Sequence, residues 1–345
     1  MSGLACGTFL IESLGATLPE ICETARAAEA AGFDGLFFGE NHFPEEGVPE
    51  ELQGAWGLTS APLTLAMAIA ACTTRIRIGT AVVALPLHHP VEVAKEATAI
   101  DVLSGGRFVL GVGAGMESNG YREYAVPFAN RVSLLEEGIE VMRRAWRHEA
   151  FSFAGRRYRF DDAALNIRPA RGEIPVWMGV KTERGMRRAG RLGLPILLDG
   201  AITFEETKAL VRVYREACAA AGTRPYVALM RDVCLGETAA DARRAYEEAV
   251  VARIRLYWQV DYLSPRYDPW VKEIHTVDEV TWALATENRI IAGAPVACVE
   301  EIRRWQRGAG VDYLIVEFLL PAGGRARVLD DIRLFGRAVL PHLGG

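Results

Sequence analysis

The chain has 345 residues, 50% of them hydrophobic and 24% charged, which gives enough apolar material for one large core and excludes the composition of a disordered protein. Its formal net charge is −5, and acidic and basic residues interleave, so nothing indicates a surface for nucleic acid or anionic membrane. Six cysteines lie far apart without a C-x-x-C pair and no apolar stretch reaches about 18 residues, so we expect a cytoplasmic protein with reduced core thiols that acts on a small molecule.

Short strand-like runs alternate with longer segments of helical period, the pattern of repeated βα units around a parallel sheet. The strand candidates, in chain order, are Cys6–Ile11, Gly35–Glu40, Arg75–Leu85, Arg107–Gly115, Ile174–Val180, Leu194–Asp199, Tyr226–Gly236 and Val311–Leu320. The main helix candidates are Leu18–Gly32, Pro62–Thr74, Pro90–Gly106, Arg131–Arg147, Phe204–Ala221, Ala239–Trp258, Ala294–Gly310 and Arg325–Leu340. About eight strands in βα order, without a linker, predict a single domain over residues 1–345 with an α/β fold, a (β/α)8 TIM barrel. An open doubly wound sheet is the alternative that counting leaves open.

Two connecting segments are longer than ordinary barrel loops, and loops of such length in a compact domain are usually functional. One is Asn41–Ala61, after the second strand, and the other is His148–Glu173, before the fifth. A third, irregular segment, Leu263–His275, carries S-P-R-Y-D-P-W. Its prolines and aromatic residues suggest an ordered lid.

In a parallel barrel the site is built at the carboxyl ends of the strands. The segment G-V-K-T-E-R-G, Gly179–Gly185, follows such a strand and enters a helix, with Thr182 able to cap it and Lys181 and Arg184 beside it. Exposed amides at a helix start with a nearby cation form an anion site, most naturally for a phosphate. A plain capping box with a solvated basic face is the alternative interpretation.

Three other strand ends carry possible chemistry. Gly111–Gly115, G-V-G-A-G, can serve only close packing, and it lacks the spacing of a dinucleotide fingerprint. His88 and His89 precede a proline at a helix start, so a structural role is the default for both. His42 follows Glu40 and Asn41 and is either a packing residue or an acid, base or hydrogen-bond donor. No hydrolase motif and no carboxylate cluster with metal spacing occurs, so we expect no metal.

Together these segments resemble the bacterial luciferase-like flavin monooxygenase superfamily. Ala28–Phe43 is similar to its A-x-x-x-G-F-D-x-x-(W/F)-x-x-E-H-H-F pattern, and Arg75–Gly115 to the block with an L-P-x-x-H-P turn, a helix and S-x-G-R-F. Pro175–Gly193 resembles its phosphate-loop segment, and Gly293–Val316 its closing helix and strand. One departure is Asn41, which stands where the luciferases have the first histidine of E-H-H-F, so light emission from aldehyde oxidation is not expected.

The resemblance implies a luciferase-like barrel with an isoalloxazine ring at the strand ends, its phosphate on the Lys181–Gly185 turn, and a non-proline cis peptide near Ala81 and Val82 behind the ring. The cofactor-binding residues that it implies are Thr80, Ala81, Val82, Gly113, Ala114, Gly115, Trp177, Gly179, Val180, Lys181, Thr182, Glu183 and Arg184. Gly113 to Gly115 would keep the pocket floor small enough for the ring. The implied catalytic residues, which would hydrogen-bond a flavin peroxide or the substrate oxygen, are His42, Asn41 and Glu40. The implied substrate residues are Trp56, Phe43 and Tyr121.

The leading interpretation is a two-component flavin monooxygenase. It would take reduced FMN from a separate flavin reductase and use O₂ to oxygenate an organic small molecule, apolar or aromatic. One alternative is a deazaflavin-dependent oxidoreductase that moves hydride without O₂, and another is a non-catalytic partner subunit that pairs with a catalytic homologue. The resemblance also suggests a homodimer.

Overall fold

The computed structural model describes residues 3–10, 16–40, 61–115, 119–319 and 321–344. The chain falls into two compact units. The first consists of Met1–Phe37, Gly47–Gly57 and Val180–Gly345, and the second of Phe38–Glu46 and Leu58–Gly179. The single domain expected from the sequence stays a prediction.

The first unit contains a parallel sheet made from both ends of the chain. Its strands are β1 (Ala5–Phe9), β2 (Gly35–Phe38), β9 (Ile196–Leu198), β10 (Val227–Leu235), β11 (Ile291–Gly293) and β12 (Tyr313–Glu317). Strand β1 pairs with β2 and β12, and β10 pairs with β12, β9 and β11, all in parallel. Every residue of β12 is buried. Such strands read as continuous apolar runs because both faces of a parallel sheet are covered.

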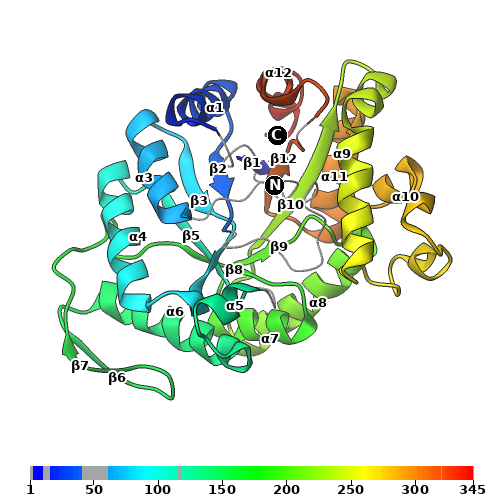
Figure 1. Ribbon diagram of the computed structural model, residues 1–345. Coiled ribbons are helices and arrows are strands. Elements are labelled where there is room, and N and C mark those ends of the chain that lie inside the picture. The colour runs from blue at the N-terminus through cyan, green and yellow to red at the C-terminus, as the bar shows by residue number, and fades with distance from the viewer. Residues whose placement is uncertain (1–2, 11–15, 41–60, 116–118, 320, 345) are drawn as a thin grey trace. The chain divides into compact units, whose positions relative to one another are not determined.

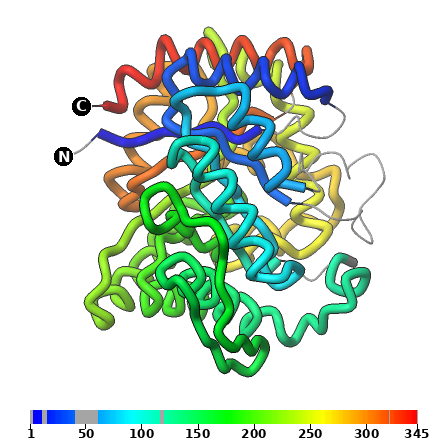
Figure 2. Tube along the Cα trace, turned by 90° about the vertical axis from the view of Figure 1, so that its left-hand side faces the viewer, coloured from blue at the N-terminus to red at the C-terminus, as the bar shows by residue number. Residues whose placement is uncertain are grey.

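Most helices of the first unit follow one of its strands in the chain. They are α1 (Leu18–Ala31), α7 (Glu183–Leu192), α8 (Phe204–Ala221), α9 (Ala239–Gln259), α10 (Trp282–Thr286), α11 (Pro295–Arg304) and α12 (Gly324–Ala338). Helices α1 and α12 lie side by side in both views, although they come from opposite ends of the chain (Figures 1 and 2). Helix α7 packs on α8. A π turn, Trp305–Ala309, extends α11 to the glycine where the sequence predicts the helix to end.

The second unit carries the middle strands of the chain. They are β3 (Arg77–Thr80), β4 (Val83–Ala84), β5 (Phe108–Gly113) and β8 (Val176–Gly179), and β5 pairs in parallel with the other three. Its helices are α3 (Pro62–Cys72), α4 (Pro90–Ser104), α5 (Asn119–Glu123) and α6 (Arg131–Arg147). Helix α4 packs against both α3 and α6.

The strand predicted over Arg75–Leu85 is wrong in its second half. Strand β3 ends at Thr80, β4 holds only two residues, and Leu85–Leu87 form a 3-10 turn whose proline cannot donate to a sheet. The peptide bond between Ala81 and Val82 is cis, which confirms the cis bond that the resemblance implies.

The loop predicted over His148–Glu173 is also wrong, because this segment contains an antiparallel hairpin. Strands β6 (Phe151–Ala154) and β7 (Arg159–Ala163) form it beside α6 (Figure 1). The carboxylate of Glu137 on α6 accepts hydrogen bonds from the backbone N–H groups of Arg156, Arg157 and Tyr158, at 3.0, 2.7 and 3.2 Å. One carboxylate thus accepts the backbone N–H groups of the hairpin turn and attaches the hairpin to the helix.

The segment Leu263–His275 is ordered, as its composition predicts. It includes a 3-10 turn, Pro269–Lys272, with Trp270 buried. Next to the turn, the Asp268 carboxylate lies 2.5 Å from a guanidinium nitrogen of Arg289, and both side chains are buried. Its role as a lid stays a prediction.

The thiols lie mostly in the core, and none of the described helices could span a membrane. Five cysteines are buried, and Cys72 is half-buried. Among the described residues, the helices are too short or too polar to cross a bilayer.

Candidate functional site

The predicted site residues divide into three groups. Outside the described residues lie Asn41, His42, Phe43 and Trp56, whose roles stay predictions. In the second unit lie Glu40, Thr80, Ala81, Val82, Gly113, Ala114, Gly115, Tyr121, Trp177 and Gly179. In the first unit lie Val180, Lys181, Thr182, Glu183 and Arg184.

Thr80 is fully buried and joins β3 to β5. Its hydroxyl donates to the carbonyl of Gly111 at 2.7 Å and accepts the N–H of the same residue at 2.9 Å. A Cβ on Gly111 would lie 1.9 Å from the carbonyl oxygen of Thr80, so the strands approach closely only because this residue is glycine. Trp177, which stands opposite Gly111 in the register of β8, is also buried. The hydroxyl of Thr80 therefore makes its hydrogen bonds within the sheet, to Gly111.

Val82 fills the space that two glycines leave at the strand ends. A Cβ on Gly113 would lie 2.8 Å from one methyl carbon of Val82, and a Cβ on Gly179 would lie 2.9 Å from the other. Ala81 and Val82 themselves are half-buried. The resemblance implies that Gly113 leaves room for a ring, whereas in the structure this room is occupied by a side chain of the chain itself.

The loop after β5 is held by Tyr121. Gly115 has a positive φ of 68°, which favours glycine, and the hydroxyl of Tyr121 donates to the carbonyl of Ala114. Burial raises the pKa of Tyr121 to about 12, although the charge of Arg131 opposes the rise. The Tyr121 ring packs edge to face against Phe128, with centroids 5.0 Å apart. Tyr121 thus remains a neutral hydrogen-bond donor with one apolar face.

Glu40 follows β2 and bonds to the segment after β3. Its side chain is 1% exposed, and one carboxylate oxygen lies 2.6 Å from Nε2 of His88. The other accepts the N–H of Ala84 at 2.5 Å. Burial lowers the pKa of His88, but the hydrogen bond and charge of Glu40, with a smaller effect of Glu96, outweigh burial and raise it. Sequence reasoning gives His88 a structural role and does not pair it with Glu40.

The turn before α7 has the cap that the sequence predicts. Thr182 is the N-cap, and its hydroxyl accepts the N–H of Gly185 at 3.2 Å. A Cβ on Gly185 would lie 2.2 Å from a methyl carbon of Val180, so the turn is tight. Thr182, Glu183 and Arg184 are exposed. The first N–H groups of a helix have no partner within the helix, so this turn presents donors next to a guanidinium.

Lys181 points to a different part of the first unit. Its ammonium donates to the carbonyl of Tyr262 at 2.9 Å and lies 2.9 Å from the centroid of the same residue's ring. The hydroxyl of Tyr262 donates to Asp199 at 2.6 Å. Burial lowers the pKa of Lys181, against the opposing charges of Asp199 and Glu206. The structure therefore separates the contacts of Lys181 from those of Thr182 and Arg184.

Sequence reasoning missed a buried ion triad in the first unit. Arg253 of α9 lies 3.0 Å from Asp232 on β10 and 2.8 Å from Glu317 on β12, and the two acids are partners in the strand register. Burial raises the pKa of Asp232, the charge of Arg253 opposes the rise, and the charge of Glu317 adds to it. The signal was present, since a charged residue inside an apolar strand is rarely buried without a partner.

A second missed arginine holds the loop after β9. Arg231 is fully buried and donates to the carbonyls of Asp199, Gly200 and Ile202 at 3.0, 2.9 and 2.8 Å. Its guanidinium carbon lies 3.9 Å from the ring centroid of Trp305. This loop contains the partner of Tyr262, so the buried arginine supports the surroundings of Lys181.

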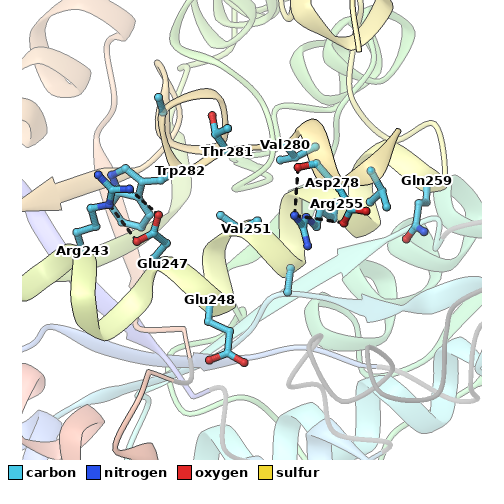
Figure 3. Close-up of a pocket in the computed structure, with 13 residues that line it drawn as sticks. Arg243, Glu247, Glu248, Val251, Arg255, Gln259, Asp278, Val280, Thr281 and Trp282 are labelled. Atoms are coloured by element: carbon cyan, nitrogen blue, oxygen red, sulfur yellow. Dashed lines mark hydrogen bonds and ion pairs between the residues drawn. The ribbon is translucent and has the colours of Figure 1, made fainter. Parts of the chain in front are cut away.

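A groove on the first unit lies between α9 and the segment that contains α10 (Figure 3). Its walls carry exposed ion pairs, Arg243 with Glu247 at 2.7 Å and Arg255 with Asp278 at 3.6 Å. The residues that line it include none of the predicted site residues. We therefore do not take this groove as the candidate site.

Comparison with known proteins matches most of the chain, including the strand ends and the turn before α7, to one family. The family described as luciferase-like monooxygenase matches residues 6–313. The 4-hydroxyprotoasukamycin monooxygenase of Streptomyces nodosus subsp. asukaensis is 28% identical over 365 aligned residues, which cover 100% of this chain and 94% of that protein.

Two solved structures have the same fold. One is the oxygenating constituent of 3,6-diketocamphane monooxygenase from Pseudomonas putida in complex with FMN, with a TM-score of 0.79 at 18% identity, covering 99% of this chain and 98% of that chain. The other is the coenzyme F420 dependent tetrahydromethanopterin reductase from Methanopyrus kandleri, with a TM-score of 0.76 at 18% identity, covering 99% and 100%. These likenesses confirm the predicted (β/α)8 TIM barrel of the luciferase-like type.

Proposed function

Because the chain belongs to the luciferase-like monooxygenase family, and is therefore an oxidoreductase, we propose that it is a two-component flavin monooxygenase. It takes reduced FMN from a separate reductase and uses O₂ to oxygenate an organic small molecule. The observation that carries the cofactor part of this proposal is the exposed, capped turn before α7, with Arg184 beside it.

The residues of this turn fit a phosphate monoester. The amides of Glu183 and Arg184 would donate to its oxygens, and the hydroxyl of Thr182 and the guanidinium of Arg184 would complete the set. The positive end of the α7 dipole favours a dianion at the same place. Lys181 is left out of this set, because its ammonium already donates to the carbonyl of Tyr262.

The strand ends of the second unit suit an aromatic ring. The half-buried Val82 offers an apolar surface, and Gly113 and Gly179 allow its side chain to pack closely. Thr80 and Trp177 stiffen this wall from inside the sheet. Reduced FMN, when bound, would supply the electrons that activate O₂, and buried apolar walls would exclude water from the reacting atoms.

The substrate part of the proposal is an apolar or aromatic molecule. Tyr121 is compatible with it, because its hydroxyl is bonded to the backbone and its buried ring contributes an apolar surface near Ala114 and Gly115. His42 and Asn41 keep their proposed catalytic roles, while Glu40 is given a different role below. A homodimer is also part of the proposal, and light scattering of the purified protein tests it.

A deazaflavin coenzyme is the second candidate for the same turn. Thr182, Glu183 and Arg184 are all exposed, which leaves solvent space for a longer anionic tail than that of FMN. A non-catalytic partner subunit is less well supported, because a subunit without cofactor has no use for a capped turn with an adjacent arginine.

Cofactor binding by the purified protein distinguishes these functions. We expect reduced FMN to bind under anaerobic conditions at least tenfold more tightly than a reduced deazaflavin, and to support O₂-dependent turnover once a reductase is added. Arg184→Ala should weaken FMN binding about tenfold or more, since a charged hydrogen bond contributes about 1.5–3 kcal/mol. Arg187→Ala is the matched control, because Arg187 lies on the same helix and pairs with Glu183 at 3.1 Å. Preference for the deazaflavin, or no binding of either cofactor, would contradict the proposal.

A further inference from the structure

Glu40 belongs to the second unit and is bonded to a short strand of the same unit, β4. Its two carboxylate oxygens accept different hydrogen bonds, one from the N–H of Ala84 at 2.5 Å and one involving Nε2 of His88 at 2.6 Å. Ala84 is the last residue of β4 and stands opposite Gly113 of β5 in the register. The carboxylate is therefore bonded to the same short strand that continues from Val82.

The carboxylate of Glu40 needs a cationic partner. Its side chain is 1% exposed, and a buried carboxylate is stable only when it is paired and hydrogen-bonded. His88 is 29% exposed, so its ring reaches both Glu40 and solvent. Among the described residues, the charged groups that act on His88 are Glu40 and Glu96, and both favour the imidazolium. His88, when protonated, thus stabilises the buried carboxylate of Glu40 by a charged hydrogen bond.

The two adjacent histidines have different surroundings. His89 occupies the histidine position of the L-P-x-x-H-P turn and is the N-cap residue of α4. Its ring lies edge to face against the rings of Tyr158 and Phe160, with centroids 6.1 and 5.9 Å away. His88 occupies an unspecified position of the pattern, so the pattern by itself does not predict its bond to Glu40.

We propose that His88 is a positioning residue, which fixes the carboxylate of Glu40 on the amide of Ala84 and so holds β4 in the wall that faces the flavin. The flavin-facing part rests on the proposed function. Both oxygens of Glu40 already accept hydrogen bonds, so Glu40 acts through β4 and not as a base toward substrate. His88 is the residue whose charge sets the strength of this link.

Amide hydrogen exchange at Ala84 tests the positioning role without any cofactor. We expect His88→Ala to accelerate exchange of the Ala84 amide about tenfold, and His88→Gln, whose amide can still donate to Glu40, to restore most of the protection. His148→Gln is the control, because His148 is exposed at the end of α6. If the alanine variant does not fold, Glu40→Gln, which removes the charged acceptor of the Ala84 amide, carries the test. Unchanged Ala84 exchange in folded His88→Ala, or in Glu40→Gln where the alanine variant does not fold, would overturn the proposal.

The affinity for reduced FMN tests the flavin-facing part. The phosphate of FMN titrates in the same pH range as a histidine, so the ratio of wild-type to His88→Gln affinity is the measured quantity. We expect this ratio to fall as the pH rises above about 6.5, because deprotonation of His88 replaces a charge-assisted hydrogen bond by a neutral one. His148→Gln should behave as the wild type. The same pH dependence in wild type and His88→Gln would refute this part. If the wild type binds neither FMN nor deazaflavin, the proposed function fails, while Ala84 exchange still decides whether His88 holds β4.

Discussion

Replacing Lys181 by methionine should lower the free energy of unfolding and leave the affinity for FMN nearly unchanged. The resemblance to luciferase-like enzymes places Lys181 in the phosphate turn. Its ammonium, however, donates to the carbonyl of Tyr262 at 2.9 Å and lies over that residue's ring. Methionine keeps the apolar stem and removes only the charge and its donors, so the substitution isolates these contacts.

The expected loss of stability follows from two contacts and one opposing cost. A hydrogen bond from a charged group contributes about 1.5–3 kcal/mol, and a partly desolvated cation–π contact about 0.5–2 kcal/mol. Burial of the ammonium opposes both, since it lowers the pKa of Lys181 in spite of Asp199 and Glu206. We therefore expect a net loss of about 1–2 kcal/mol, which corresponds to a decrease of a few degrees in Tm.

Urea unfolding and anaerobic FMN titration, carried out on the same variants, measure the two quantities separately. Lys208→Met is the control for loss of a lysine, because Lys208 forms an exposed pair with Glu205 that should contribute less than about 1 kcal/mol. Arg184→Ala should show the opposite pattern, with weaker FMN binding and unchanged unfolding. A Lys181→Met protein with wild-type unfolding and a tenfold loss of FMN affinity would refute the reasoning.

Three further substitutions test the buried network, the close strand approach and the pH dependence. Arg253→Met should destabilise the protein by about 3–5 kcal/mol, because it leaves two buried carboxylates without their cationic partner. Adding Asp232→Asn should recover part of this loss in urea unfolding, and no recovery would contradict the prediction. Gly111→Ala should cost about 1–3 kcal/mol or more, since its Cβ would meet a backbone oxygen at 1.9 Å, whereas Gly200→Ala, with its nearest atom at 3.7 Å, should cost little in the same assay. The folded-state pKa of His88 is raised, so its stabilising contribution is complete below the unfolded value of about 6.5 and is lost as the pH rises through the folded value. The stability difference between wild type and His88→Gln should therefore be largest in mild acid and shrink toward alkaline pH; a difference that grows with pH would be inconsistent with this sign.

Long helices could be predicted from the sequence with their bounds. The predicted Arg131–Arg147 and Phe204–Ala221 agree with the structure at both ends. In the second, Thr203 caps the start and Gly222 takes the left-handed conformation after the end, so both signals are local. Strand β11 was not predicted, because its apolar run Ile290–Ala292 is shorter than the run Leu194–Leu198 that predicts the equally short β9.

The candidate site follows the same division between local and distant contacts. The cap of Thr182 on Gly185 spans three residues and was predicted. The contact of Lys181 with Tyr262 spans 81 residues, and that of Glu40 with His88 spans 48. Sequence patterns identify which residues can donate or accept, but the fold decides which of them meet. The grouping of Glu40 with Asn41 and His42 stays a prediction, because both neighbours lie outside the described residues, and the structure adds His88 as a distant partner.

Gly113 shows why a shared residue need not have the purpose that the family pattern suggests. The resemblance explains it as space for a flavin ring, yet a Cβ there would first meet the side chain of Val82, which also fills the space at Gly179. The two glycines therefore allow the methyl groups of Val82 to pack between the strands. Strand β4 begins directly after Val82 and ends at Ala84, whose N–H donates to the carboxylate of Glu40. The position of this apolar surface thus depends on the glycines at one end of a short segment and on the Glu40 and His88 pair at the other.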